Sequence, residues 1–141
     1  MDLQVTQENL NKALSNVARV ATGRTTLPIL SNVLLQVENN RLRISATNLD
    51  IAISQHVGTK IKSEGSLTVP ARLFQDFVNN LPKTTISLKQ DGHKLHVHAD
   101  NYKSTINGVP VDDYPVMPAI QDGNSFSISA PAFKKALQQV I

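Results

Sequence analysis

The sequence predicts an α+β fold made of two βαβββ repeats, with the helices on one face of antiparallel sheet. Three observations predict it. Short runs rich in Val, Ile and Leu are joined by hairpin-type turns, and two longer stretches each carry one apolar stripe at helical spacing. The second strand–helix start, at Leu67, follows the first, at Leu3, by 64 residues. With 141 residues, 40% of them hydrophobic, the chain suits one full-sized domain but not two.

The first repeat opens with an alternating strand at residues 3–5. Thr6 can cap the following helix, and Glu8 in the first turn suits the helix dipole. The apolar stripe of this helix consists of Leu10, Ala13, Leu14, Val17 and Val20, and Gly23 lies where the helix should end. Three strands are then predicted, at residues 29–37, 41–47 and 51–57, the first two joined by the hairpin connection Glu38-Asn39-Asn40.

The second repeat has the same order. A strand at 67–69 leads through Pro70 into a helix that Pro82 stops. Its apolar stripe consists of Phe74, Phe77, Val78 and Leu81. Strands are predicted at 85–89, 94–98 and 102–106, with an Asp91-Gly92 turn of the kind that favours type I′ hairpins between the first two. The polar stretch 58–65 between the repeats is a strand edge or a loop.

A third strand–helix start follows. The segment from Phe126 to Val140 repeats the spacing of the second start at an offset of 59 residues, with Phe133 in the place of Phe74. We therefore expect residues 1–120 to form one domain, and 121–141 to be a connector plus the first strand and helix of a truncated second domain. The alternative is a C-terminal helix docked on the first domain.

Composition excludes several classes of protein. The chain has no cysteine, which removes disulfide frameworks, thiolate zinc sites and cysteine nucleophiles. No window approaches the roughly 18 apolar residues that span a bilayer, and the N-terminus lacks the features of a signal peptide. We expect a cytoplasmic protein that is neither exported nor bound to a membrane.

Motifs for catalysis are missing from the sequence. It contains no phosphate-binding glycine loop, no Gly-x-Ser-x-Gly elbow and no His-Glu-x-x-His pair. His96, His98 and Asp100 have a spacing that places them on one face of a strand, where imidazoles can bind zinc or nickel, but a solvated strand face is the favoured interpretation. Asp112 and Asp113 place two carboxylates side by side, and a polar connector is the favoured interpretation of this pair. We expect no catalytic residues, no cofactor and no metal.

Basic residues recur with the helices. Lys12 and Arg19 lie off the apolar stripe of the first helix, Arg24 follows its end, and Arg72 lies in the second helix. Phe74, Phe77 and Phe133 belong to apolar stripes, so a platform for base stacking is missing. Any contact with nucleic acid should therefore be to phosphates and insensitive to sequence. The alternative is an ordinary solvated helix face, because a net charge of +3 permits binding to polyanions without demonstrating it.

Four ordered stretches carry a resemblance to a known family. They are Gly23-Arg24-Thr25-Thr26-Leu27-Pro28-Ile29-Leu30-Ser31-Asn32-Val33-Leu34-Leu35, Ala46-Thr47-Asn48-Leu49-Asp50, Val69-Pro70-Ala71-Arg72-Leu73-Phe74 and Val109-Pro110-Val111-Asp112-Asp113-Tyr114-Pro115. The chain closely resembles the N-terminal domain of bacterial DNA polymerase III beta subunits, the replicative sliding clamps. Thr25 and Ser31 depart from the family pattern, where many members have Pro and Gly.

The resemblance implies a fold, a function and a set of contacts. Similar proteins are head-to-tail dimers of three-domain protomers that form a ring, with helices lining the hole and sheets outside. The ring holds a DNA polymerase on duplex DNA as a processivity factor in DNA replication and performs no chemistry. The polymerase III core and the clamp loader bind through domains absent from this chain.

The resemblance also assigns residues. Arg24 matches the family's arginine near the DNA, and Lys12, Arg19 and Arg72 are expected at the DNA from their helix positions. The strand that pairs with the neighbouring protomer corresponds to Tyr102, Lys103, Ser104, Thr105 and Ile106, with Ser104 where some members carry a large apolar residue. Two alternatives remain open at this point: a stand-alone clamp-like interaction module and a metal-binding protein.

Overall fold

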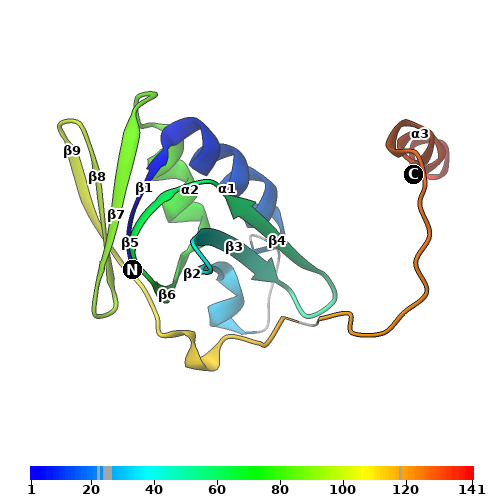
Figure 1. Ribbon diagram of the computed structural model, residues 1–141, viewed down its shortest axis with the longest axis horizontal. Coiled ribbons are helices and arrows are strands. Elements are labelled where there is room, and N and C mark those ends of the chain that lie inside the picture. The colour runs from blue at the N-terminus through cyan, green and yellow to red at the C-terminus, as the bar shows by residue number, and fades with distance from the viewer. Residues whose placement is uncertain (22, 24–26, 118) are drawn as a thin grey trace.

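The computed structural model describes residues 1–21, 23, 27–117 and 119–141, and in these it contains both predicted repeats (Figure 1). The first repeat consists of β1 (Asp2–Thr6), α1 (Gln7–Ala21), β2 (Asn32–Glu38), β3 (Arg41–Thr47) and β4 (Ala52–Val57). The second consists of β6 (Gly65–Pro70), α2 (Ala71–Asn79), β7 (Thr85–Asp91), β8 (Lys94–Ala99) and β9 (Tyr102–Asn107). A short strand, β5 (Lys60–Ser63), lies between the two repeats. The sequence predicted either a strand edge or a loop for residues 58–65, and the structure has a strand there.

The two repeats exchange their first strands. Sheet A has the order β5-β1-β7-β8-β9, and sheet B has the order β4-β3-β2-β6. β1 of the first repeat therefore pairs with β7 of the second, and β6 of the second pairs with β2 of the first, in both cases antiparallel. Because each sheet needs a strand from both repeats, neither repeat can complete its own sheet.

The hairpin turns follow from residues that tolerate positive φ. Asn39 and Asn40 have φ of 51° and 60°, the pattern of a type I′ turn, and they join β2 to β3 as predicted. In the β7–β8 hairpin, Asp91 pairs with Lys94, so Gly92 occupies the first central position with φ of 57°. The residue after Gly92 does not share its positive φ, so this turn differs from the type I′ turn that the Asp-Gly pair predicts.

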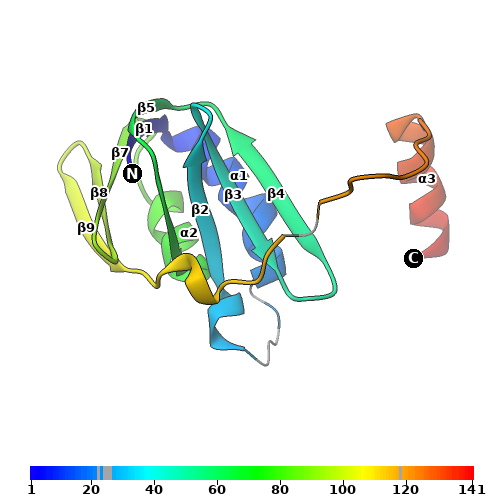
Figure 2. The same cartoon turned by 60° about the horizontal axis from the view of Figure 1, so that its bottom comes forward.

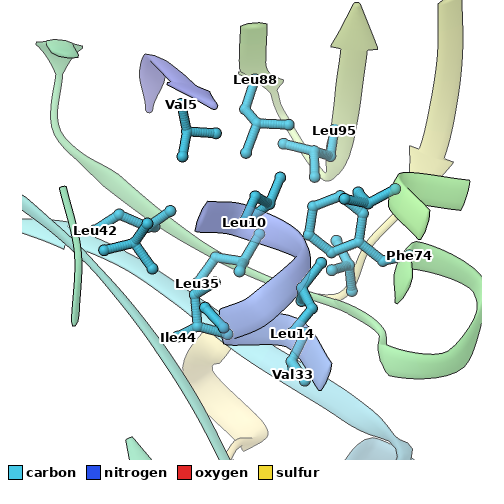
Figure 3. Packing of buried hydrophobic residues seen from close by; sticks show 14 of the residues in the cluster. Val5, Leu10, Leu14, Val33, Leu35, Leu42, Ile44, Phe74, Leu88 and Leu95 are labelled. Atoms are coloured by element: carbon cyan, nitrogen blue, oxygen red, sulfur yellow. The ribbon is translucent and has the colours of Figure 1, made fainter. Parts of the chain in front are cut away.

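The helices pack against the two sheets, with their apolar stripes toward a shared core (Figure 2). Thr6 caps α1 as predicted, since its Oγ1 accepts from the backbone N of Asn9 at 3.3 Å. Figure 3 shows the centre of the core. Its members include Leu10 and Leu14 of α1, Phe74 of α2, Leu88 and Leu95 of sheet A, and Leu35 and Ile44 of sheet B. The core thus fixes the positions of both helices relative to both sheets.

Residues 28–31 differ from the prediction. They form a 3-10 helix, Pro28–Ser31, and β2 begins only at Asn32. Pro28 supplies the first helical position, where its missing N–H costs nothing, and the backbone N of Leu30 donates to the carbonyl of Leu27 at 3.1 Å. The apolar character of this stretch predicts burial, but the proline decides its backbone conformation.

The C-terminal segment stands apart from the rest of the molecule in both views (Figures 1 and 2). α3 (Ala130–Val140) forms as predicted, capped by Ser129 Oγ, which accepts from the backbone N of Ala132 at 3.4 Å. Every residue from 119 to 141 is exposed, so α3 is not buried against the first domain in this structure. The strand expected at 126–128 is also missing, because no other described strand pairs with that segment.

Candidate nucleic-acid interface

α1 and α2 lie side by side and antiparallel. Asn11 Nδ2 donates to Asn79 Oδ1 at 3.2 Å, and Gln75 Nε2 donates to Ser15 Oγ at 3.5 Å. The 64-residue offset equates Asn11 with Gln75 and Ser15 with Asn79, so the two hydrogen bonds are related by an approximate two-fold axis. The start of α2 therefore lies beside the end of α1. We call α1 and α2 together the helix pair.

The predicted cations lie on the outer face of the helix pair. Lys12 and Arg19 are both exposed, and their separation of seven residues places them about two turns apart on one side of α1, opposite its buried stripe. Arg72 is exposed in the first turn of α2. Since α2 begins beside the end of α1, the fold brings Arg72 and Arg19 to the same end of the helix pair. Arg24 lies outside the described residues.

The other end of the helix pair is partly neutralised. Lys83 Nζ lies 3.0 Å from Glu8 Oε1, in an ion pair between two exposed side chains. The two-fold relation equates Glu8 with Arg72 and Lys83 with Arg19. One end of the helix pair therefore carries a carboxylate and an ammonium group, whereas the equivalent positions at the other end carry two guanidinium groups. Among these four equivalent positions, the arginine end therefore carries the larger positive charge.

Exposed aromatic side chains that could stack on bases are missing from this face in the described part of the chain. Phe74 is fully buried, and Phe77 packs against the core. The exposed positions of the helix pair hold mainly charged and amide groups, with Leu73 as an exposed aliphatic residue. Such a surface can hold phosphates by charge and hydrogen bonding.

The predicted interface strand is a free sheet edge. β9 contains Tyr102, Lys103, Ser104, Thr105 and Ile106, and its only described partner is β8. Ile106 is buried, whereas Tyr102 is 54% exposed. The backbone groups on the open side of β9 are thus available for pairing with another strand.

The proposed metal ligands do not converge. His96 Nδ1 lies 2.9 Å from Thr105 Oγ1, and Asp100, in the turn after β8, accepts from Thr84 Oγ1 at 3.2 Å. Within the residues that the structure describes, no group of three His, Cys, Asp or Glu side chains could hold a metal ion. Asp112 and Asp113 are exposed in a short 3-10 helix, Val111–Asp113, and belong to the connector, in agreement with their polar interpretation.

Sequence reasoning missed the role of Tyr114. Its hydroxyl donates to the carbonyl of Asn32 at 3.4 Å and accepts from the backbone N of Thr47 at 3.2 Å, so it ties the connector to the ends of β2 and β3. Burial raises the pKa of Tyr114 above its ordinary value of 10.0 by more than the hydrogen bond from Thr47 lowers it. The Asp-Tyr-Pro stretch of the connector was the signal in the sequence that pointed to Tyr114. It does not reveal which backbone groups the hydroxyl would hydrogen-bond to.

The helices of the described residues include none that is both long and apolar enough to span a membrane.

Two beta sliding clamps are similar to this chain in sequence. A Caulobacter vibrioides beta sliding clamp is 36% identical over 132 residues, covering 92% of this chain and 35% of the relative. A Pseudomonas aeruginosa beta sliding clamp is 33% identical over 141 residues, covering 99% of this chain and 38% of the relative. The chain thus spans little more than a third of the length of these relatives.

Solved structures show the same fold. The crystal structure of the DNA polymerase III subunit beta from Pseudomonas aeruginosa matches with a TM-score of 0.91 at 31% identity, over 99% of this chain and 38% of that one. The clamp from Bartonella birtlesii, bound to griselimycin, matches with a TM-score of 0.89 at 33% identity, over 95% of this chain and 36% of that one. The family model described as "DNA polymerase III beta subunit, N-terminal domain" matches residues 1–118. The chain therefore belongs to the DNA polymerase III beta subunit family.

Proposed function

We propose that this chain is the N-terminal part of a DNA sliding clamp, the non-catalytic processivity factor of DNA polymerase III. One observation carries the proposal: the helix pair presents Lys12, Arg19 and Arg72 on the face that points away from both sheets. In a ring with helices inside, these cations and Arg24 attract the phosphates of the enclosed duplex. Weak contacts that do not depend on sequence leave the ring free to slide.

Ring closure would use the free edge of sheet A. We propose that the backbone of Tyr102–Ile106 pairs with a strand of a neighbouring protomer, giving a head-to-tail homodimer. The open hydrogen-bonding side of β9 and the partly exposed Tyr102 support this assignment. The polymerase core and the clamp loader would bind through domains outside this chain, and the assembly would act in the cytoplasm.

We assign residues 1–120 to the first clamp domain and 121–141 to a connector plus the start of a second, with α3 as its first helix and 126–128 as a strand that would form only when it pairs within that domain's own sheet. The exposed apolar side chains of the C-terminal segment support the assignment. They are Phe126, Ile128, Phe133, Leu137 and Val140, which recur at the spacing of the buried stripes of the two repeats. An exposed apolar stripe of this kind needs a sheet to cover it.

The test is the binding of a fluorescein-labelled 20-base-pair duplex to the 141-residue chain, followed by anisotropy from 25 to 300 mM NaCl. We expect weak binding that falls steeply with salt and is the same for unrelated sequences. The variant Lys12→Gln/Arg19→Gln/Arg72→Gln should bind more weakly. Its salt slope should be lower by up to about 0.9 for each phosphate that the protein no longer neutralises.

A matched control keeps the same change in net charge. Arg41→Gln/Lys134→Gln/Lys135→Gln removes three exposed cations that lie away from the helix pair, on β3 and α3. Binding that is tight, resistant to salt and selective for sequence would contradict the proposal. So would an equal weakening of binding in the two variants.

The metal-binding alternative has a separate test. Calorimetric titration of the chain with zinc should give no stoichiometric heat. Saturable binding of one zinc ion, abolished by His96→Ala, would support that alternative instead.

A further inference from the structure

The face of sheet A that points away from the helix pair is strongly basic. On β7 and β8 the core takes Leu88, Leu95 and Val97, so the alternate residues of these strands point outward. The outward lysines of the sheet are Lys60, Lys62, Lys89, Lys94 and Lys103, all exposed. We call this surface the outer face of sheet A.

Opposing charge on this face is small. The outward carboxylates of the sheet strands are Asp2, which pairs across strands with Lys89, and Asp91, which pairs with Lys94. In the described part of the chain, no carboxylate forms an ion pair with any of the five lysines. The outer face thus keeps an excess of positive charge that is available to an external anion.

The strand register spreads the cations over the whole width of the sheet. Lys60 on β5 pairs with Gln4 on β1, and Lys103 on β9 pairs with His98 on β8, so the two lysines lie at opposite edges of the same sheet. Four strand spacings of about 4.8 Å separate these edges by roughly 19 Å. At a rise of about 3.4 Å per nucleotide of one strand of a duplex, this width faces about five or six consecutive phosphates.

The chemistry of the other outward side chains favours a nucleic acid over a protein. Gln4, Ser87, Thr105 and the two histidines of β8 can all hydrogen-bond to phosphate oxygens. Phe, Tyr, Trp and aliphatic residues do not occur among the outward strand positions of this face. A protein partner would therefore find no buried anchor of the kind that dominates protein interfaces.

A hollow of about 360 Å³ adds a place for one anionic group. It is lined by His96, His98, Lys103 and Thr105, on the β8–β9 half of the face. His96 Nδ1 is held 2.9 Å from Thr105 Oγ1, which leaves the Nε2 side of this ring for an external group.

We propose that the outer face of sheet A is a second binding surface for the phosphodiester backbone of nucleic acid, separate from the helix pair. The helices pack on the opposite side of the sheet, so one straight duplex cannot contact both surfaces at once (Figure 1). This surface would hold a strand that lies outside the ring of the proposed clamp. The ligand is recognised through phosphate charge and not through base sequence.

The test uses the 141-residue chain and two fluorescein-labelled probes, a 20-nucleotide single strand and a 20-base-pair duplex, at 50 mM NaCl and in a salt series. The variant is Lys60→Gln/Lys89→Gln/Lys94→Gln, which leaves the proposed interface strand β9 intact. Because the helix pair is unchanged in this variant, we expect the number of probe molecules bound per chain at saturation to fall from two to one. The control Arg41→Gln/Lys134→Gln/Lys135→Gln should weaken binding less than about threefold.

The outcomes separate this proposal from the proposed function. If the sheet variant behaves as the control does while Lys12→Gln/Arg19→Gln/Arg72→Gln weakens binding, the second surface is absent and the clamp proposal stands. If each variant removes one bound probe per chain and the combined variant retains neither, there are two independent surfaces; effects that multiply would instead mean that one probe contacts both surfaces at once. The probe whose binding weakens more identifies the source of the phosphates, single-stranded or duplex. Displacement of both probes by poly-glutamate at a lower charge concentration than unlabelled DNA requires would overturn the proposal in favour of an acidic protein partner.

Discussion

At the scale of single residues, two contacts of the connector decide how it is held on sheet B. Tyr114 reaches the ends of β2 and β3 with its hydroxyl. Upstream, Val109 exchanges backbone hydrogen bonds with Thr68 on β6, at 2.9 and 3.1 Å. Gly108 lets these backbones approach each other. The motif Val-Pro-x-x-Asp-Tyr-Pro thus holds the connector on sheet B through hydrogen bonds. The contribution of each of its residues can be tested by substitution.

Tyr114→Phe should reduce the free energy of unfolding by about 1 kcal/mol at pH 7, because it leaves the Thr47 amide without its buried acceptor. The pKa of Tyr114 is raised in the folded state, so its neutral form is favoured there. Its contribution is therefore complete below pH 10 and disappears as pH rises through the raised pKa. Urea unfolding of both proteins at pH 7, 10 and 11 should show the difference shrinking at high pH. A constant difference would contradict this account of Tyr114.

Gly108→Ala should destabilise the fold by about 1–3 kcal/mol, because a Cβ at this position would lie 2.6 Å from the carbonyl oxygen of Thr68 and 2.9 Å from Leu67 Cδ1. Gly58→Ala is the matched control. Nothing lies within 4 Å of a Cβ there, so its effect should stay within about 0.5 kcal/mol. Thermal unfolding of the two variants distinguishes them. Equal melting temperatures would show that the connector does not pack as closely as described.

At the scale of elements, the two repeats place equivalent residues in equivalent surroundings. Leu10 of α1 and Phe74 of α2 are equivalent by the 64-residue offset, and both are fully buried. Phe133 of α3 is their counterpart in the third start, yet it is 48% exposed. The same apolar stripe is therefore buried in the core in α1 and α2 but exposed to solvent in α3.

Phe74→Ala should cost about 3–5 kcal/mol in the free energy of unfolding, since it empties a fully buried site. Phe133→Ala in the same chain should change it by less than about 0.5 kcal/mol. Chemical denaturation followed by far-ultraviolet circular dichroism measures both. A decrease of several kcal/mol in Phe133→Ala would show that α3 packs on the first domain after all.

Most helices and strands could be predicted from the sequence. Features that depend on contacts between distant parts of the chain could not. Periodicity and turn residues located α1, α2 and the strands, because each signal is local. The exchange of β1 and β6 between the sheets could not be predicted, since alternation shows which face of a strand is buried but not which strand pairs with it. Pro28 converted the start of a predicted strand into a 3-10 helix.

At the scale of the whole molecule, the fold places two basic surfaces on opposite sides of one core. The helix pair carries Lys12, Arg19 and Arg72, and the outer face of sheet A carries lysines from four strands. The cations of the helix pair could be predicted from their positions off the apolar stripes. That Arg19 and Arg72 meet at one end could not be predicted, because it depends on the antiparallel packing of α1 against α2. The basic sheet face escaped sequence reasoning for a similar reason: its lysines are far apart in the chain and meet only through strand order.

The most direct test of the central claim, that duplex DNA lies along the helix pair, uses the natural absence of cysteine. A single cysteine at Asn9 or Asp76, both on the helix pair, can carry an iron–EDTA group that cleaves nearby DNA by hydroxyl radicals, and Ser54→Cys on the outer face of sheet B is the control. We expect even cleavage along a mixed-sequence duplex from both helix positions and little from Ser54. Cleavage as strong from Ser54 as from the helix positions, or cleavage confined to one sequence, would contradict the claim.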